Sequence, residues 1–415
     1  AWKPSNKARA LFDGFHAVRD QVDHRANTLV WQVEGRTLHL LQADRASQLS
    51  VQAMILATGA SERLLPFPGW TLPGVFTLGA AQVALKAQAT LVGPRVVMAG
   101  SGPLLYLVAW QYLRAGAQVL AVLDAAPPEG PRQALPGLLA RPSMAFKGAW
   151  YLAQLALAGV PVQRGVGGLQ ARGHGRVEQL HWQAQGREHS IACDAVAFSH
   201  GLRSETALAE LAGCALDWDE LDQAWRPRRD AAGRSSVAGV YLAGDGAGIV
   251  GADAAALAGE RAALAALEDL GQTVDRSRAA ALERALVSQQ RFRAAVEVLS
   301  PPPADWAETV DDALVICRCE EVTAGELRAC VRDTGAQELS RLKALCRIGM
   351  GRCQGRMCGA AAARLLAQAT GLPLKNVGRL RSQPPVKPVP IAVLGALQGA
   401  AAAQARHVPN EQRDD

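Results

Sequence analysis

The chain has 415 residues, 49% of them hydrophobic and 20% charged, which is enough for two or three domains with buried cores. No apolar run reaches the ~20 residues of a transmembrane helix, and the polar, basic N-terminus does not resemble a signal peptide, which favours a cytoplasmic protein with peripheral membrane association left open. The net charge of +6 arises in residues 312–415, which hold 15 Lys and Arg against 9 Asp and Glu. Aromatic residues make up only 5% and do not alternate with the basic ones, which argues against a nucleic-acid partner.

The first half of the chain alternates between predicted strands and turns. Residues 27–57 form short alternating runs that predict antiparallel strands leading into a buried strand. A turn rich in Pro and Gly follows at 65–76. Residues 95–124 then predict a strand, a turn, a helix and a second strand. Residues 140–165 predict a helix followed by an extended segment.

The turn at 100–102 predicts a nucleotide site. Gly100 and Gly102 stand between a β-branched strand and a helix, where backbone can approach a pyrophosphate at the helix N-terminus. Asp124 ends the next strand, where an acid can accept a hydrogen bond from a ribose 2′-hydroxyl. Leu105 occupies the place of the third glycine. We therefore predict an adenine nucleotide here, either NAD or ATP/ADP, rather than NADP.

Two motifs flank this unit, ATG at 57–59 and AGDGAG at 243–248. Their order resembles that of two-dinucleotide-binding flavoproteins of the glutathione-reductase type, in which a nucleotide domain is inserted into an FAD domain. The resemblance implies bound FAD, with Gly59, Gly244 and Asp245 in its site and Asp245 accepting a hydrogen bond from the ribityl chain.

Such flavoproteins begin with a strand–GxGxxG–helix unit that binds the FAD pyrophosphate. Only 56 residues precede Ala57, and none of them contains GxG. We therefore expect a fold without the first FAD-binding βαβ unit, a pattern that favours a truncated chain.

Six of the eight cysteines lie within 42 residues, after a Pro-rich linker. Cys317 and Cys319 form one close pair and Cys353 and Cys358 another, and two predicted helices between them would bring the pairs together. The first helix opens with the capping box TAGE at 323–326. Four thiolates suit a [2Fe–2S] cluster or zinc, although C-x-C is short for a zinc knuckle. Nearby glycines at 349, 351, 355 and 359 would let backbone N–H groups reach the sulfurs.

The remaining four cysteines have other predicted roles. Cys193 and Cys214 lie in apolar surroundings and are interpreted as buried structural thiols. Cys346 is an alternative metal ligand, and Cys330 lies inside a predicted helix. Four arginines near the four-cysteine set are expected to offset the negative charge of a cluster: Arg318, Arg347, Arg352 and Arg356.

The cysteine segment VICRCEEVTAGELRACVRD with LKALCRIGMGRCQGRMCG closely resembles the bacterioferritin-associated-ferredoxin-like [2Fe–2S] domain. Together with SERLLPFPGWTLPGVFTLGAAQ and AGDGAGIVGADAAALAG, it resembles the large flavoprotein subunit of opine oxidases, hydrogen cyanide synthase and related D-amino-acid or proline dehydrogenases. The resemblance extends from about residue 3 to 390, and it implies a [2Fe–2S] cluster on Cys317, Cys319, Cys353 and Cys358.

The resemblance also implies a division of labour. A smaller flavoprotein subunit would oxidise the amine substrate, with a small ferredoxin-like subunit as a further candidate partner, and this chain would pass the electrons onward. Two alternatives are an NAD(P)H-dependent reductase and a non-catalytic assembly subunit. His200, at the end of a predicted strand, would face the flavin, although a structural role is the simpler interpretation.

The predicted fold class is α/β, a two-dinucleotide-binding flavoprotein with a small helical [2Fe–2S] domain. The predicted divisions are a partial FAD domain at 1–92, an inserted nucleotide-binding domain at 93–190, the continued FAD domain at 191–299, a linker at 300–311, a [2Fe–2S] domain at 312–382 and a Pro/Ala-rich tail at 383–415.

Overall fold

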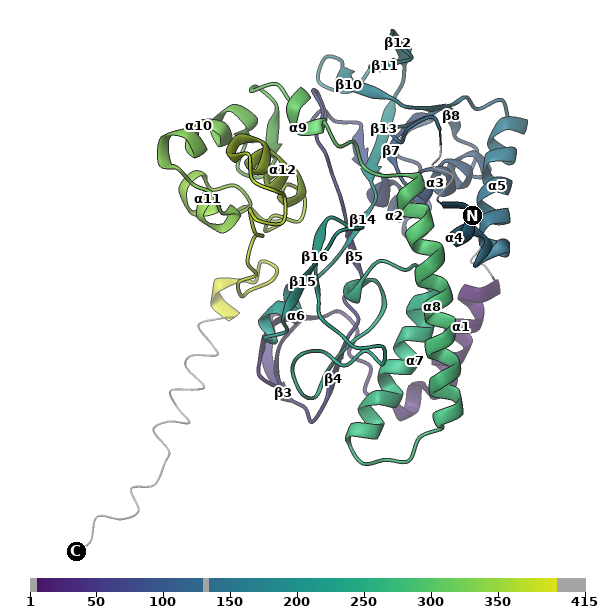
Figure 1. Ribbon diagram of the computed structural model, residues 1–415, viewed down its shortest axis with the longest axis vertical. Helices are drawn as coiled ribbons and strands as arrows, with labels where there is room; N and C mark the ends of the chain where they lie inside the picture. The colour runs from purple at the N-terminus through teal and green to yellow at the C-terminus, as the bar shows by residue number, and fades with distance from the viewer. Residues whose placement is uncertain (1–5, 130–133, 394–415) are drawn as a thin grey trace, which may run out of the picture.

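The computed structural model describes residues 6–129 and 134–393. Figure 1 shows a sheet with flanking helices, a second α/β part with the long helices α7 and α8, and a helical C-terminal domain. The predicted tail at 383–415 is described only as far as residue 393. No helix within the two described ranges is long and apolar enough to cross a membrane.

The largest sheet has five parallel strands in the order β6-β13-β7-β8-β9. Every residue of β7 except Arg95 is buried, as is typical of a strand covered on both faces. The elements of this part are β6 (Val75–Thr77), α2 (Leu78–Ala87), β7 (Arg95–Ser101), α3 (Pro103–Arg114), β8 (Gln118–Asp124), α4 (Leu135–Leu139), α5 (Pro142–Leu157), β9 (Val162–Arg164) and β13 (Ala195–His200).

Different elements cover the two faces of this sheet. Helices α2, α3 and α5 cover one face, where Leu85, Leu105 and Leu155 pack against Val96 and Met98. The other face packs against an antiparallel meander and against the C-terminal domain. The meander consists of β10 (Gly167–Arg172), β11 (Gln179–Ala184) and β12 (Arg187–Ala192).

The sheet extends beyond the predicted limits of the inserted domain. β6 and β13 lie outside 93–190, yet both are hydrogen-bonded members of the sheet. Sequence periodicity could not assign them, because a short buried strand has the same pattern in either domain.

The second α/β part is built around β4 (Met54–Leu56) and β17 (Val240–Leu242), which pair in parallel. Residues 6–56 contain an N-terminal helix and an antiparallel meander, and no parallel βαβ unit within that range. The other elements are α1 (Asn6–Val18), β1 (Thr28–Glu34), β2 (Thr37–Gln42), β3 (Arg45–Ser50), η1 (Arg19–Gln21), α6 (Ala207–Leu211), η3 (Gly244–Ala247), α7 (Ala252–Asp269) and α8 (Arg276–Leu299).

Two short antiparallel pairs lie where this part meets the others. β5 (Ala60–Glu62) pairs with β14 (Leu202–Ser204). The chain enters the five-stranded part through β5 and leaves it through β14, so the two connecting segments lie side by side. β15 (Leu216–Asp219) pairs with β16 (Ala224–Pro227).

The C-terminal domain contains β18 (Val315–Cys317), β19 (Val322–Thr323), α10 (Ala324–Thr334), α11 (Leu339–Cys346) and α12 (Gly359–Thr370). The predicted capping box is confirmed, because Thr323 Oγ1 accepts from the Glu326 N–H and the Glu326 carboxylate accepts from the Thr323 N–H. Such a cap satisfies two donors that the first helical turn leaves free.

The C-terminal domain shares one hydrophobic core with the five-stranded sheet. Phe67 and Trp70, from the predicted Pro- and Gly-rich turn, lie in this core with Phe198 of β13 and with Ile316 and Leu366. Trp70 donates its indole N–H to Val315 O at 2.7 Å. The turn therefore fastens two parts of the chain that lie some 245 residues apart.

The predicted linker at 300–311 is not a free spacer. Residues Trp306–Thr309 form helix α9, and Trp306 is buried, with its indole N–H donating to Pro66 O at 2.9 Å. The burial of Trp306 fixes this segment against the rest of the protein, although its three prolines favoured a linker.

Candidate functional site

The ATG and AGDGAG motifs lie against each other. A Cβ on Gly246 would stand 2.5 Å from Thr58 Oγ1 and 3.3 Å from the Gly59 nitrogen. A distance of 2.5 Å is shorter than real Cβ contacts, so only glycine fits at 246. Gly59 and Gly244 both have positive φ, at 74° and 64°, which favours glycine at these turns. The two motifs, which are far apart in sequence, therefore form one cradle.

Asp245 lies in this cradle at the turn before α7. Its Oδ1 accepts hydrogen bonds from the backbone N–H groups of Val250 and Gly251, both at 2.9 Å. Ser204 Oγ donates to the Asp245 backbone carbonyl at 2.7 Å. Within the described residues Oδ2 accepts no hydrogen bond, which leaves it available to a hydroxyl group of a bound cofactor.

The two glycines of the predicted nucleotide turn, Gly100 and Gly102, differ in why glycine is needed there. A Cβ on Gly100 would lie 1.7 Å from Ser199 O, so this glycine is needed for the approach of β7 to β13. Gly102, at the N-cap of α3, has φ of 101°, and a Cβ there would meet Gly201 only at 3.7 Å. Gly102 thus leaves space at the helix N-terminus. Gly100 is explained by the packing of β7 against β13, so its presence is no evidence for a bound ligand.

Asp124 differs from its predicted role. Its side chain is wholly buried, with Oδ1 accepting from the Ala126 N–H at 2.9 Å and Oδ2 accepting from the Tyr106 hydroxyl. Arg164 Nε lies 3.6 Å from Oδ2. Burial raises the pKa of this carboxyl, opposed by the bond from Tyr106. A ribose hydroxyl could reach Asp124 only by displacing Tyr106, so the expected 2′-hydroxyl contact does not fit this arrangement.

The four cysteines of the predicted cluster meet in one place. The Cys358 thiol interacts with those of Cys317 and Cys353 and lowers the pKa of both, and Cys319 interacts with Cys353. The four thiols therefore lie near one another. No group of three or more His, Cys, Asp or Glu residues in the described ranges already has the arrangement of a metal site. The ligand set therefore stays a prediction, now with the four thiols near one another.

Backbone donors surround these sulfurs, as the nearby glycines predicted. The Cys358 thiol lowers the pKa of Cys317 to about 6, and the N–H groups of Gly349, Glu320 and Cys319 act in the same direction. Gly355 and Met357 do the same for Cys353, whose pKa falls to about 5, chiefly through Cys358. Such donors stabilise thiolate, the form that binds metal. The same thiol contacts raise the pKa of Cys358, and burial raises that of Cys319.

Gly351 leaves no room for a side chain beside the first cysteine pair. A Cβ at this position would lie 2.1 Å from Cys319 Cβ and 3.2 Å from its sulfur. The donor set, the inward N–H groups and this close approach together fit a sulfur-ligated centre.

The other four cysteines lie elsewhere. Cys346 contacts Cys330 rather than the four-cysteine set, which removes the reason to treat Cys346 as an alternative ligand. Burial raises the pKa of Cys346 to about 11. Cys193 and Cys214 are buried, as predicted.

Most of the arginines expected to offset a cluster's charge already have partners. Arg356 pairs with Glu205 and Arg347 with Glu320, with N–O distances of 2.7 and 2.8 Å. The Arg318 guanidinium lies 5.8 Å from the ring centroid of Trp70. These contacts reduce the positive charge available to the sulfurs.

Glu205 joins the cradle formed by the motifs at 57–59 and 243–248, here called the glycine cradle, to the loop between Cys353 and Cys358, here called the cysteine loop. Its backbone carbonyl accepts from Thr58 Oγ1 at 2.6 Å, and its N–H donates to Gly59 O at 3.0 Å. Its carboxylate accepts from Arg356 Nε at 2.7 Å and from Nη2 at 3.1 Å. Sequence reasoning missed this residue, because nothing local marks a glutamate that pairs across 151 positions.

His200 is buried at the end of β13 and its Nδ1 has no hydrogen-bond partner among the described residues. Burial, with Arg63 and Arg364 nearby, lowers its pKa to about 3. The side chain is therefore neutral at physiological pH, consistent with the structural interpretation.

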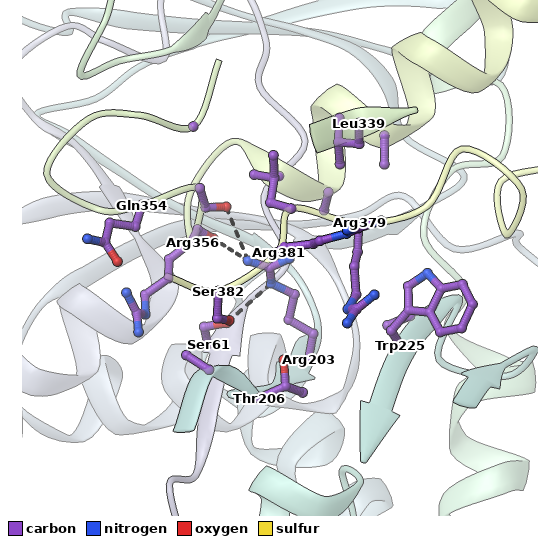
Figure 2. Close-up of a pocket in the computed structure, with 18 of the residues that line it drawn as sticks. Ser61, Arg203, Thr206, Trp225, Leu339, Gln354, Arg356, Arg379, Arg381 and Ser382 are labelled. Carbon is purple, nitrogen blue, oxygen red and sulfur yellow. Dashed lines mark hydrogen bonds between the residues drawn. The ribbon is translucent and has the colours of Figure 1, made fainter. Parts of the chain in front are cut away.

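A cavity of about 430 Å³ opens between the C-terminal domain and the strands β5, β14 and β16. Figure 2 shows Arg203 reaching between Ser61 and the backbone of Arg356, with Arg379 and Trp225 nearby. The basic residues lining the cavity are Arg63, Arg203, Lys343, Arg347, Arg356, Arg364, Arg379 and Arg381. Sequence reasoning noticed the basic C-terminal region but could not assemble this wall from three parts of the chain.

Comparison with known proteins agrees with this architecture. Residues 5–278 match the pyridine nucleotide-disulphide oxidoreductase family, and residues 314–398, which contain the four cysteines, match the sarcosine oxidase A3 domain. The predicted dinucleotide-binding fold is confirmed.

Among solved structures, L-proline dehydrogenase from P. horikoshii has the same fold with a TM-score of 0.62 at 20% identity. The match covers 89% of this chain and 64% of the other, so this chain spans less than two thirds of that protein.

Two characterised relatives resemble the chain over most of its length. The opine oxidase A subunit of Rhizobium meliloti is 37% identical, covering 97% of this chain and 78% of the relative. The hydrogen cyanide synthase component HcnB of Pseudomonas aeruginosa is 34% identical, covering 92% and 84%. The chain therefore belongs to the pyridine nucleotide-disulphide oxidoreductase family and, within it, to the oxidoreductase subunits that include HcnB and its opine oxidase counterpart.

Proposed function

We propose that this chain is the electron-transfer subunit of a larger dehydrogenase or oxidase acting on amine donors such as opines, imino acids or D-amino acids. The observation that carries the proposal is the Glu205 connection, which joins the glycine cradle directly to the loop of Cys353 and Cys358. Two redox centres that exchange electrons need a short, fixed separation, and one residue bonded to both sites provides it.

The glycine cradle would hold FAD. Gly59, Gly244 and Gly246 allow the backbone turns to approach a dinucleotide, and Asp245 Oδ2 would accept a hydrogen bond from the ribityl chain. Helix α7 begins at Ala252 directly after this turn, and its N-terminus would favour negative charge.

The four thiolates of Cys317, Cys319, Cys353 and Cys358 would hold a [2Fe–2S] cluster. Such a cluster takes up and releases one electron at a time. The chain's own part is to stabilise the thiolates and orient the sulfurs. The backbone N–H groups of Gly349 and Gly355 lower the pKa values of Cys317 and Cys353, and Ile348 and Leu327 are fully buried in the adjoining core. Donors to sulfur raise the potential of a cluster.

Amine oxidation itself would take place in a partner. We propose that this partner is a smaller flavoprotein subunit, with a small ferredoxin-like subunit as a further candidate, because both named relatives are single components of larger enzymes. In support, His200 is buried and held neutral, which makes it a poor candidate for an acid–base group here.

The alternative of an NAD(P)H-dependent reductase receives less support. Its nicotinamide cofactor would bind at 95–124, where Asp124 is already occupied by Tyr106 and Ala126. The other alternative, a non-catalytic role in assembly, gives no reason for four thiols to share backbone donors.

The test is an anaerobic absorption spectrum of the purified chain, with iron, sulfide and flavin analysis. We expect about two irons and two sulfides per chain, with visible bands that bleach on reduction by dithionite. Cys353→Ser should lose iron, while Cys214→Ser, a buried cysteine outside the set, should retain it. Zinc in place of iron, or retention of iron in Cys353→Ser, would overturn the proposal.

A further inference from the structure

The cavity between the C-terminal domain and the strands β5, β14 and β16 has an unusual charge balance. Eight of its lining residues are basic and only one, Glu205, is acidic. Three of the basic residues are neutralised by ion pairs: Arg347 with Glu320, Arg356 with Glu205 and Arg379 with Glu210. Within the described ranges, the other five have no carboxylate within 4.0 Å.

Of those five, Arg63 is buried and Arg203 and Arg364 are partly buried. Arg63 is 4% exposed and donates to the backbone carbonyl of Asp222, and Arg364 donates to the amide oxygen of Gln223 at 2.6 Å. Arg203 donates only to neutral oxygens, those of Ser61, Gly355 and Arg356. Burying several cations without anions is costly, and a bound anion would remove that cost.

Three buried donors in residues that line the cavity also lack hydrogen-bond partners. The indole nitrogens of Trp218 and Trp225, and Nε of Arg379, are buried without a hydrogen-bond partner in the described residues. All three residues line the cavity. Buried donors are normally satisfied, so these three unpaired donors are an unmet cost in the structure beside the cavity.

We propose that this cavity binds an anion carrying phosphoryl groups. A phosphoryl group brings up to two negative charges and three acceptor oxygens, which matches the guanidinium forks that line the cavity. The volume of about 430 Å³ lies within the range of small-molecule sites. Gly59, Asp245 and the four cysteines do not line the cavity. It adjoins both sites, because Ser204 and Glu205 bond the cradle and Gly349 and Gly355 lie beside the cysteines.

The binding site would also contact the cysteine loop. Arg203 holds the carbonyls of Gly355 and Arg356, which lie between Cys353 and Cys358. An anion that drew Arg203 toward the cavity would alter this loop, so occupancy and the cysteine site are expected to be coupled.

The experiment uses calorimetric titration of the full chain with inorganic pyrophosphate, ADP and citrate. We expect pyrophosphate to bind and Arg364→Gln to weaken it by about tenfold or more, the value of one charge-assisted hydrogen bond. Arg381→Gln, at the exposed rim, tests the same site if Arg364→Gln fails to fold. Arg278→Gln is the matched control, because Arg278 lies on the exposed α8 surface, paired with Glu260.

The three ligands separate the possible sources. Tighter binding of ADP than of pyrophosphate, with both weakened by Arg364→Gln, identifies a nucleotide; equal binding identifies free phosphates, and either supports the proposal. ADP binding that ignores Arg364 and Arg381 would belong to another site and would overturn it. Citrate binding as tightly as pyrophosphate would replace the phosphoryl assignment, and binding of none of the three would end it.

Discussion

The carboxylate of Glu205 and the guanidinium of Arg356 form a two-point ion pair, with N–O distances of 2.7 and 3.1 Å. The pair lies between β14 and the cysteine loop, and both side chains are largely buried. Because Glu205 also bonds Thr58 and Gly59 through its backbone, a change at this pair reaches both candidate redox sites.

Glu205→Ala is expected to lower the free energy of unfolding by about 2 kcal/mol, since Arg356 would keep its buried charge without a partner. Urea unfolding measures this change. Glu260→Ala breaks the exposed pair with Arg278 and should leave the midpoint unchanged. Equal effects of the two variants would mean that the buried pair has no special role.

Gly351→Ala is expected to lower the iron content of the purified chain, because the new Cβ would overlap Cys319 Cβ at 2.1 Å. Iron analysis, normalised to protein, measures it. Gly259→Ala, inside α7 with no atom within 4 Å of the new Cβ, should keep its iron and gain about 0.5–1 kcal/mol of stability. Full iron in Gly351→Ala would show that the loop can shift away.

Cys346→Ser and Cys330→Ser should keep the full iron content, because these two thiols contact each other rather than the four-cysteine set. Cys319→Ser, by contrast, should lose it. Iron and sulfide analysis of the three variants, prepared side by side, provides the measurement. Loss of iron in Cys346→Ser would restore Cys346 as a ligand.

His200 makes the fold sensitive to acid. Its folded pKa of about 3 lies below the unfolded value near 6.5, so the unfolded chain binds the extra proton and stability falls as the pH drops below about 6.5. Between pH 8 and pH 5 this costs about 2 kcal/mol. His200→Gln should remove that loss in urea unfolding at the two pH values, whereas the exposed His174→Gln should not. An unchanged pH dependence in His200→Gln would assign the acid sensitivity to other groups.

Tyr106→Phe removes the hydroxyl that donates to Asp124 Oδ2. We expect a loss of about 1–3 kcal/mol in unfolding free energy, since the carboxylate stays buried with one acceptor unmet. Tyr151→Phe is the control, because its hydroxyl makes no hydrogen bond to the described residues. Calorimetry then measures the NAD affinity of Tyr106→Phe. A higher affinity would show that the Tyr106–Asp124 hydrogen bond limits nucleotide binding, and an unchanged affinity would show that it does not.

The sequence was most informative where a function depends on local order. The strand–turn–helix at 95–124 and the capping box at Thr323 were predictable, because periodicity and spacing set them within a few turns of chain. Glu205 and the cavity were not, because their partners lie about 150 residues away and no pattern in one segment encodes the other. The predicted role of Asp124 was wrong for a related reason. An acidic residue at the end of a strand has the same sequence pattern whether its carboxylate binds a ribose or a buried tyrosine.

The core shared by Phe67, Phe198, Ile316 and Leu366 has a consequence for how the chain loses its structure. A domain on a flexible tether would melt separately, but here the same apolar contacts belong to both the cysteine domain and the five-stranded sheet. Oxidative damage at Cys317 would disturb its neighbour Ile316 and, through this core, the sheet, so it should expose the whole chain to proteolysis rather than release a small fragment.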